Sequence, residues 1–160
     1  DGLFLEQVGH PELVSALRAF WPGRGPQWDG LGRAADGTVV LVEAKAHGSE
    51  LRSRCAAGSR SLIRIRTALQ ETARALGVGV TPTWTNGYYQ YANRLAHLHF
   101  LRSHGVSARL LCVYLVGDAT MGGPTSPAEW RVPLGRMYTA LGLAPPLSGV
   151  VNAFVGVAGL

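Results

Sequence analysis

The feature of this sequence that most restricts its fold is an uninterrupted apolar run from Leu110 to Val116. The run has seven residues, whereas a helix that spans a bilayer needs about 20. A short, continuous apolar run, in place of an alternation of apolar and polar residues, is typical of a central or parallel strand. We therefore expect a buried strand over residues 108–116, within a sheet that helices cover.

Helical spacing of apolar residues and the positions of Gly and Pro predict the other elements. The expected helices span residues 11–21, 59–76, 88–103 and part of 127–141, with a further helical piece near residues 3–8. A β-hairpin is expected over residues 27–33 and 38–47, a loop over 48–60 and a last strand over 150–157. This order predicts an α/β fold with a central mixed β-sheet and flanking helices.

Composition indicates one folded domain. The chain has 160 residues, of which 47% are hydrophobic and 16% charged, and this balance is typical of a globular domain. A chain of this length usually builds one core, and no linker divides the sequence, so a single domain over residues 1–160 is expected. No apolar stretch is long enough to span a membrane. Two cysteines, Cys55 and Cys112, permit at most one disulfide, which suits a reducing, cytoplasmic location. Cys112 is expected to pack in the core.

The basic residues are unusual in kind. The chain carries a formal charge of +5, and all but one of its 15 basic residues are arginine. A basic balance permits a polyanionic partner such as nucleic acid. The single lysine, Lys45, stands between Ala44 and Ala46, so a Walker phosphate loop is excluded because that loop needs Gly-Lys-Ser/Thr. The Gly-x-Ser-x-Gly and His-Glu-x-x-His motifs are also absent from the sequence.

The second strand of the expected hairpin carries charged residues on one face. Because side chains alternate along a strand, Glu43, Lys45 and His47 share a side, and the other side carries Val42, Ala44 and Ala46. The turn between the strands decides whether Asp29 joins them. A three-residue loop at positions 35–37 puts Asp29 opposite Glu43, whereas a two-residue turn pairs it with Ala44. We favour the longer loop, with Gly37 in the positive φ that such loops require.

Two carboxylates that face each other repel unless a cation lies between them. Oxygen ligands favour Mg²⁺, or Mn²⁺, over zinc. Asp29, Glu43 and the backbone carbonyl of Ala44 are therefore candidate metal ligands. Lys45 would orient a water molecule or stabilise developing negative charge as a compact cation.

The segment Trp28-Asp29-Gly30, followed by the run from Val39 to Lys45, resembles the signature of the PD-(D/E)XK nuclease superfamily. The resemblance implies a restriction-endonuclease-like fold and Mg²⁺-dependent hydrolysis of phosphodiester bonds in nucleic acid, DNA more than RNA. It implies Asp29 and Glu43 as metal ligands and Lys45 as the catalytic lysine. Trp28 stands where the family has proline, and little room precedes Asp29 for the strand usually found there.

Several alternatives stay open. The chain could be a restriction-endonuclease-like module without turnover that binds nucleic acid or protein, or a hydrolase of small phosphoesters. Many such nucleases cut as dimers, so a homodimer is one expectation. Many members also supply a further glutamate from the first helix, for which Glu6 and Glu12 are the candidates.

Two further sets of polar residues could contact a substrate. Five arginines follow the expected site, namely Arg52, Arg54, Arg60, Arg64 and Arg66; they would contact phosphates or form a solvated basic face. The expected helix over residues 88–103 carries a polar stripe of Gln90, Asn93, Arg94 and His97. We interpret this stripe as a solvent-facing surface. In the alternative, His47, Gln90 and Arg94 contact the substrate, with the aromatic residues Trp84, Tyr88 and Tyr89 beside them for stacking.

Overall fold

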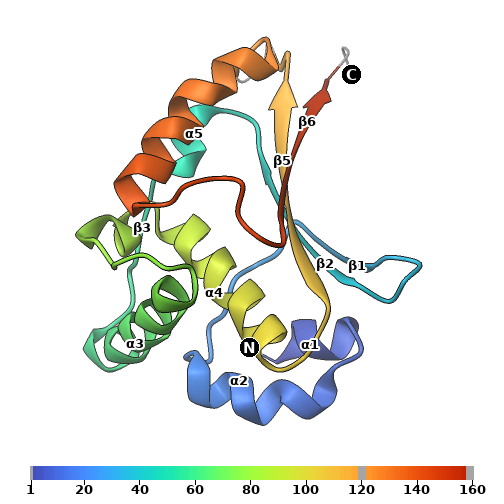
Figure 1. Cartoon of the computed structure of the whole chain (residues 1–160), viewed down its shortest axis with the longest axis vertical. Helices are drawn as coiled ribbons and strands as arrows, with labels where there is room; N and C mark the ends of the chain where they lie inside the picture. The colour runs from blue at the N-terminus through green and yellow to red at the C-terminus, as the bar shows by residue number, and fades with distance from the viewer. Residues whose placement is uncertain (1, 119–121, 158–160) are drawn as a thin grey trace.

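A four-stranded mixed sheet with the order β1-β2-β5-β6 forms the centre of the computed structural model, which describes residues 2–118 and 122–157 (Figure 1). The strands are β1 (Gly30–Arg33), β2 (Val39–Lys45), β5 (Ala108–Val116) and β6 (Val150–Gly156). β1 is antiparallel to β2, whereas β5 lies between two parallel neighbours, β2 and β6. The expected α/β fold with a mixed sheet and flanking helices is thus confirmed, and so is the central position of β5.

The helices and the shorter elements follow the expected order. The helices are α1 (Leu3–Gln7), α2 (Val14–Phe20), α3 (Ser59–Ala75), α4 (Tyr89–Ser103) and α5 (Pro127–Leu141). The 3₁₀ helices are η1 (Pro11–Leu13), η2 (Gly48–Leu51) and η3 (Pro82–Trp84). The strands β3 (Ser53–Arg54) and β4 (Asn86–Gly87) pair in a small antiparallel ribbon of their own. The expected loop over residues 48–60 therefore contains η2 and β3. Within the described ranges, no helix combines the length and the apolar character needed to cross a membrane.

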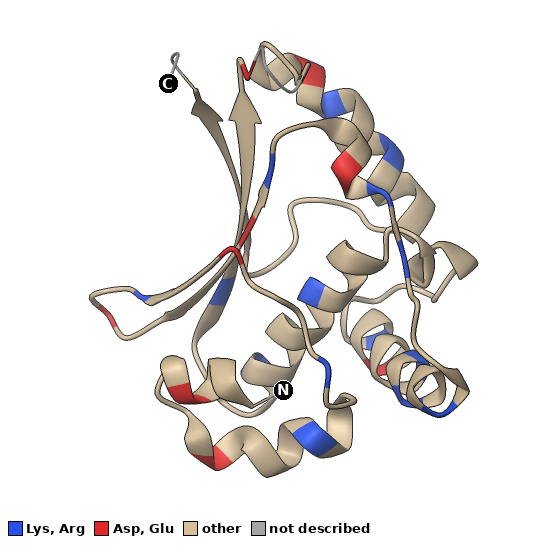
Figure 2. Cartoon of the chain, turned by 180° about the vertical axis from the view of Figure 1, so that it is seen from behind, with Lys and Arg blue, Asp and Glu red and all other residues tan. Residues whose placement is uncertain are grey.

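Helices cover only one face of the sheet (Figures 1 and 2). On the covered face, alternate residues of β5, among them Leu110, Cys112 and Tyr114, are buried. On the other face, Leu111 and Val113 are only partly buried, and Arg109 is exposed. In the described part of the chain, β5 is therefore central in the sheet but covered by helices on one face only.

The turn between β1 and β2 is the three-residue loop that the sequence favours. The Ala34 N–H donates to the Thr38 carbonyl at 2.9 Å, and Gly37 adopts a φ of +82°, a conformation that costs glycine little because it has no Cβ. The Asp36 carboxylate accepts the Thr38 N–H at 2.9 Å and supports the turn. These local interactions set the register of the whole hairpin.

The register has the consequence that matters for the site. Gly30 pairs with Val42, and the same register continued by one residue sets Asp29 opposite Glu43. No strand is described between α2 and β1, so the described sheet lacks the strand that the family resemblance puts before the aspartate. Asp29 is therefore carried by an irregular segment that enters β1 from the loop after α2.

Candidate active site

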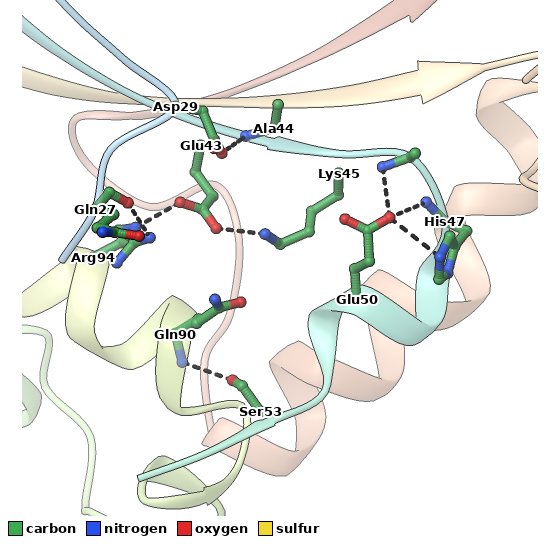
Figure 3. A network of polar contacts seen from close by, with 11 residues as sticks. Gln27, Asp29, Glu43, Ala44, Lys45, His47, Glu50, Ser53, Gln90 and Arg94 are labelled. Carbon is green, nitrogen blue, oxygen red and sulfur yellow. Dashed lines mark hydrogen bonds and ion pairs between the residues drawn. The ribbon is translucent and has the colours of Figure 1, made fainter. Parts of the chain in front are cut away.

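Glu43 is a buried carboxylate held by two cations. β2 directs it to the covered face of the sheet, where it is 6% exposed. Its Oε1 lies 2.5 Å from Lys45 Nζ, and its Oε2 lies 2.6 Å from Arg94 Nε (Figure 3). A buried charge without a partner is strongly unfavourable, so these two ion pairs offset the cost of burying the Glu43 carboxylate.

Arg94 comes from α4 and is itself fixed on several sides. It is 4% exposed, its Nη2 donates to the Gln27 carbonyl at 2.8 Å, and its guanidinium lies 4.8 Å from the centre of the Trp28 ring. A guanidinium keeps its charge in proteins and stacks well on aromatic faces. Arg94 therefore connects α4 to Glu43 and to the segment that carries Asp29.

Asp29 is an exposed carboxylate at the end of the hairpin. Its Oδ2 accepts the Ala44 N–H at 2.8 Å (Figure 3). β1 begins at Gly30, so it has no strand residue that could pair with Ala44 of β2. The Asp29 carboxylate accepts the Ala44 N–H in place of a backbone carbonyl. In a strand the N–H and C=O of one residue point to the same side, so the Ala44 carbonyl faces the same edge as Asp29.

Asp29, Glu43 and Lys45 line a single open cleft of about 660 Å³. The expectation that these three groups share one site therefore agrees with the geometry. The cleft is completed by Gln90, Asn93 and Arg94 of α4 and by the segment over residues 23–27. Gln90 is exposed at the first turn of α4, where its backbone N–H donates to Ser53 Oγ at 2.8 Å.

The polar stripe of α4 is not a solvent-facing surface. Asn93, Arg94 and His97 are 6%, 4% and 0% exposed, respectively, and only Gln90 is exposed. The interpretation drawn from helical amphipathicity was therefore wrong, because α4 is packed against other elements on nearly all sides. Arg94 meets Glu43, which the sequence did not reveal, since the two residues lie on elements far apart in the chain.

His97 occupies the opposite, aromatic end of this stripe. Its ring lies 4.9 Å from Trp21, 5.9 Å from Phe4 and 6.1 Å from Trp28, measured between ring centres. Nδ1 pairs with the Asn93 carbonyl at 2.9 Å. Burial lowers the pKa of His97 to about 3, so the ring is neutral at physiological pH. His97 is therefore a core residue.

His47 lies outside the cleft lining. β2 ends at Lys45, and the chain turns into η2 at Gly48. The His47 ring pairs with Ser49 Oγ at 2.5 Å and with Glu50 Oε1 at 3.3 Å. Glu50 Oε1 also accepts the backbone N–H groups of Ala46 and His47, each at 3.1 Å (Figure 3). The alternation that predicted a shared face with Glu43 thus stops before His47, whose contacts are those of a turn.

The two further glutamates also lie outside the cleft lining. Glu6 and Glu12 are exposed, and Glu12 pairs with His10 Nδ1 at 3.0 Å. The arginines that follow the site are all exposed, at positions 52, 54, 60, 64 and 66. Two of them have protein contacts: Arg64 donates to the Arg18 carbonyl at 3.0 Å, and Arg52 lies 5.3 Å from the centre of the Tyr88 ring.

Cys112 lies beside Glu43 in the register of the sheet and is 2% exposed. Burial raises the pKa of its thiol to about 12, so the thiol stays protonated and unreactive at neutral pH. Both cysteines are free. Cys112 therefore packs in the core, as expected.

The cleft suits a hard divalent cation through oxygen atoms alone. The described residues contain no cluster of three or more His, Cys, Asp and Glu side chains able to hold a metal. The available donors are the exposed Asp29 carboxylate, the Glu43 carboxylate and the Ala44 carbonyl. Mg²⁺ typically takes one or two carboxylates and keeps several waters, so these donors fit it.

No protein-family model matches the chain, and comparisons with curated proteins and with solved structures give no significant match either. The case for a function therefore depends on the chemistry of the cleft.

Proposed function

We propose that this protein is a Mg²⁺-dependent nuclease with a restriction-endonuclease-like core, and that it hydrolyses phosphodiester bonds in nucleic acid. One observation carries the proposal. Two carboxylates from paired segments and the only lysine of the chain line one cleft, with Lys45 Nζ 2.5 Å from Glu43. Nucleic acid, with DNA as the first polymer to test, is favoured over protein substrates by the formal charge of +5.

The residues of the cleft would have different roles in the reaction. Asp29, Glu43 and the Ala44 carbonyl would hold the cation. A bound Mg²⁺ supplies polarisation of a phosphoryl oxygen and a lower pKa for a coordinated water. Lys45 presents its ammonium group to the cleft, where it stabilises the negative charge that develops on the phosphate. Arg94 keeps Glu43 in position from the buried side.

The charge balance of the cleft supports an anionic substrate. The cleft is lined by two carboxylates, Asp29 and Glu43, and by three cations, Arg24, Lys45 and Arg94, so its lining carries a formal charge of +1 before any metal binds. A bound divalent ion would then leave the cleft with a larger net positive charge, which attracts a phosphate diester. A neutral substrate would gain nothing from this arrangement.

The test is a cleavage assay with plasmid DNA, single-stranded DNA, RNA and bis(p-nitrophenyl) phosphate, each with Mg²⁺, with Mn²⁺ and with EDTA. We expect cleavage of a polymer that EDTA abolishes. Asp29→Asn, Glu43→Gln and Lys45→Met should each lower the rate at least about 100-fold, the usual loss for an electrostatic catalytic group. Glu6→Gln, which replaces an exposed carboxylate outside the cleft, should keep the wild-type rate.

Other outcomes would overturn the proposal in distinct ways. Binding of nucleic acid without turnover would indicate the non-catalytic module. Cleavage of the small ester alone would indicate a phosphoesterase. Wild-type rates in the Asp29 and Lys45 variants would exclude the cleft as the active site.

A further inference from the structure

A second hollow of about 590 Å³ adjoins the cleft. It lies between the loop after α2 and the start of α3, and it shares Gly23, Arg24 and Tyr89 with the cleft. The two hollows therefore form one groove. This groove leads from Glu43 and Lys45, past Tyr89, to Gly58 and Ser61 at the beginning of α3.

The chemistry of the second hollow suits a phosphate-bearing strand. No Asp or Glu is among the described residues that line it, and Arg24, which is exposed, supplies a cation where the hollow meets the cleft. Ala56, Ala57 and Gly58, which have small side chains or none, also line the hollow. Figure 2 shows further basic positions along α3.

Tyr89 lies where the two hollows meet and offers an aromatic ring on which a base can stack. Its ring is half-buried and borders both hollows. Burial raises the pKa of its hydroxyl, so the side chain brings no negative charge into the groove. Aromatic side chains bind unpaired bases by stacking, whereas the base faces inside a duplex are already covered by their neighbours. A tyrosine in this position therefore favours a single strand.

The size of the groove favours a polymer over a small ester as the substrate. Small-molecule sites typically enclose about 300–1,000 Å³, so the cleft alone would hold a small phosphodiester. Such a substrate would leave unused the part of the second hollow that lies beyond Arg24 and Tyr89. A strand that continues beyond the scissile phosphate would occupy both hollows.

We infer that Arg24 and Tyr89 form a subsite for an unpaired nucleotide next to the scissile phosphate, and that the substrate is a single strand or a frayed end of a duplex. This inference rests on the proposed nuclease function and extends it to the kind of substrate. Arg24 contacts a phosphate of the strand, and Tyr89 stacks on its base.

Steady-state kinetics on two substrates test the subsite. With a single-stranded oligonucleotide, Tyr89→Leu should raise KM at least about fivefold, the lower end of what one stacked base contributes. With bis(p-nitrophenyl) phosphate, the rise in KM should be smaller than with the oligonucleotide, because that ester occupies the cleft and not the second hollow. Tyr89→Phe keeps the ring and should behave as wild type on both substrates. A Tyr89→Leu variant that loses both activities together would overturn the inference.

Salt dependence tests Arg24 separately. Arg24→Gln should weaken oligonucleotide binding and reduce the slope of log affinity against log salt by about one. Arg131→Gln, an exposed arginine on α5, is the matched control and should change neither by more than about twofold. An unchanged salt slope in Arg24→Gln would exclude Arg24 as a phosphate contact.

A binding measurement in EDTA distinguishes failure of the subsite from failure of the proposed function. By fluorescence anisotropy, wild type should bind the single strand at least about fivefold more tightly than a blunt duplex, and Tyr89→Leu should remove this preference. Absence of any cleavage with the preference intact would reject the nuclease and keep the subsite. Cleavage of single strand and duplex with equal efficiency, unchanged in Tyr89→Leu, would reject the subsite and keep the nuclease.

Discussion

Arg94 and His97 lie one helical turn apart on α4 and are equally hidden from solvent, yet one is charged and the other neutral. They are 4% and 0% exposed, respectively. Arg94 faces Glu43 Oε2 at 2.6 Å. His97 faces three aromatic rings, and burial lowers its pKa to about 3. The same polar stripe therefore has an ionic end at the cleft and a neutral end in the core.

The difference shows what makes a buried polar residue part of a site. Arg94 cannot lose its proton, so its burial requires a carboxylate from another element, and Glu43 provides it. His97 can become neutral, so its burial requires no charged partner, and its Nδ1 pairs with the Asn93 carbonyl. Arg94, which needs a charged partner from a distant part of the chain, is therefore the residue of this pair that lines the cleft.

The largest expected effect on stability comes from removing Arg94, the charged residue of the stripe. Arg94→Leu leaves the buried Glu43 with Lys45 as its remaining cation, and it should lower the free energy of unfolding by about 3 kcal/mol. Urea denaturation measures this change. Arg66→Leu, at an exposed position of α3, should change the unfolding free energy by less than about 0.5 kcal/mol. A loss below about 1 kcal/mol for Arg94→Leu would mean that Lys45 alone suffices to hold Glu43.

The buried, neutral His97 should make the free energy of unfolding depend on pH. The pKa of His97 is about 3 in the folded chain, because burial lowers it from the ordinary histidine value of 6.5. Between these values the unfolded chain binds a proton that the folded chain does not, so stability falls as the pH decreases through this range. The slope attributable to His97 is at most about 1.4 kcal/mol per pH unit.

Unfolding free energies measured from pH 6 to pH 4 test this slope. His97→Leu should have a shallower pH dependence than wild type by about 1 kcal/mol per unit. His99→Leu removes a histidine that pairs with Glu71 at the surface of α4, and it should keep more of the wild-type slope. Equal slopes in wild type and His97→Leu would mean that His97 is protonated in the folded chain.

The smallest expected effect concerns Gln90, the first position of the stripe, which borders the cleft but is exposed. Gln90→Ala should change the unfolding free energy by less than about 0.5 kcal/mol. If its amide contacts substrate, the cleavage rate should fall by up to about tenfold, the value of one neutral hydrogen bond. Unchanged stability together with an unchanged rate would remove Gln90 from the site and restrict the functional part of the stripe to Arg94.

Much of the fold could be predicted because its signals are local. Gly37 and the neighbouring loop residues set the hairpin register, and this register sets Asp29 opposite Glu43. Alternation along β2 brings Glu43 and Lys45 to the same side. The boundaries of α3, α4 and β5 follow from periodicity and from the glycines that stop the helices.

Other features could not be predicted from local patterns. Ten of the 15 residues of α4 are buried, so its polar stripe gave no reliable indication of which side faces solvent. Arg94 and Glu43 are 51 positions apart, and only the docking of α4 against the sheet brings them together. The turn at Gly48 likewise removes His47 from the face that alternation had assigned to it.

The sequence by itself determined the order of the elements, the hairpin register and the pairing of a glutamate with a lysine on one strand, because each depends on residues close together in the chain. The tertiary structure alone decided which charges are buried together, because the free energy of a buried charge depends on the groups that other elements bring to it.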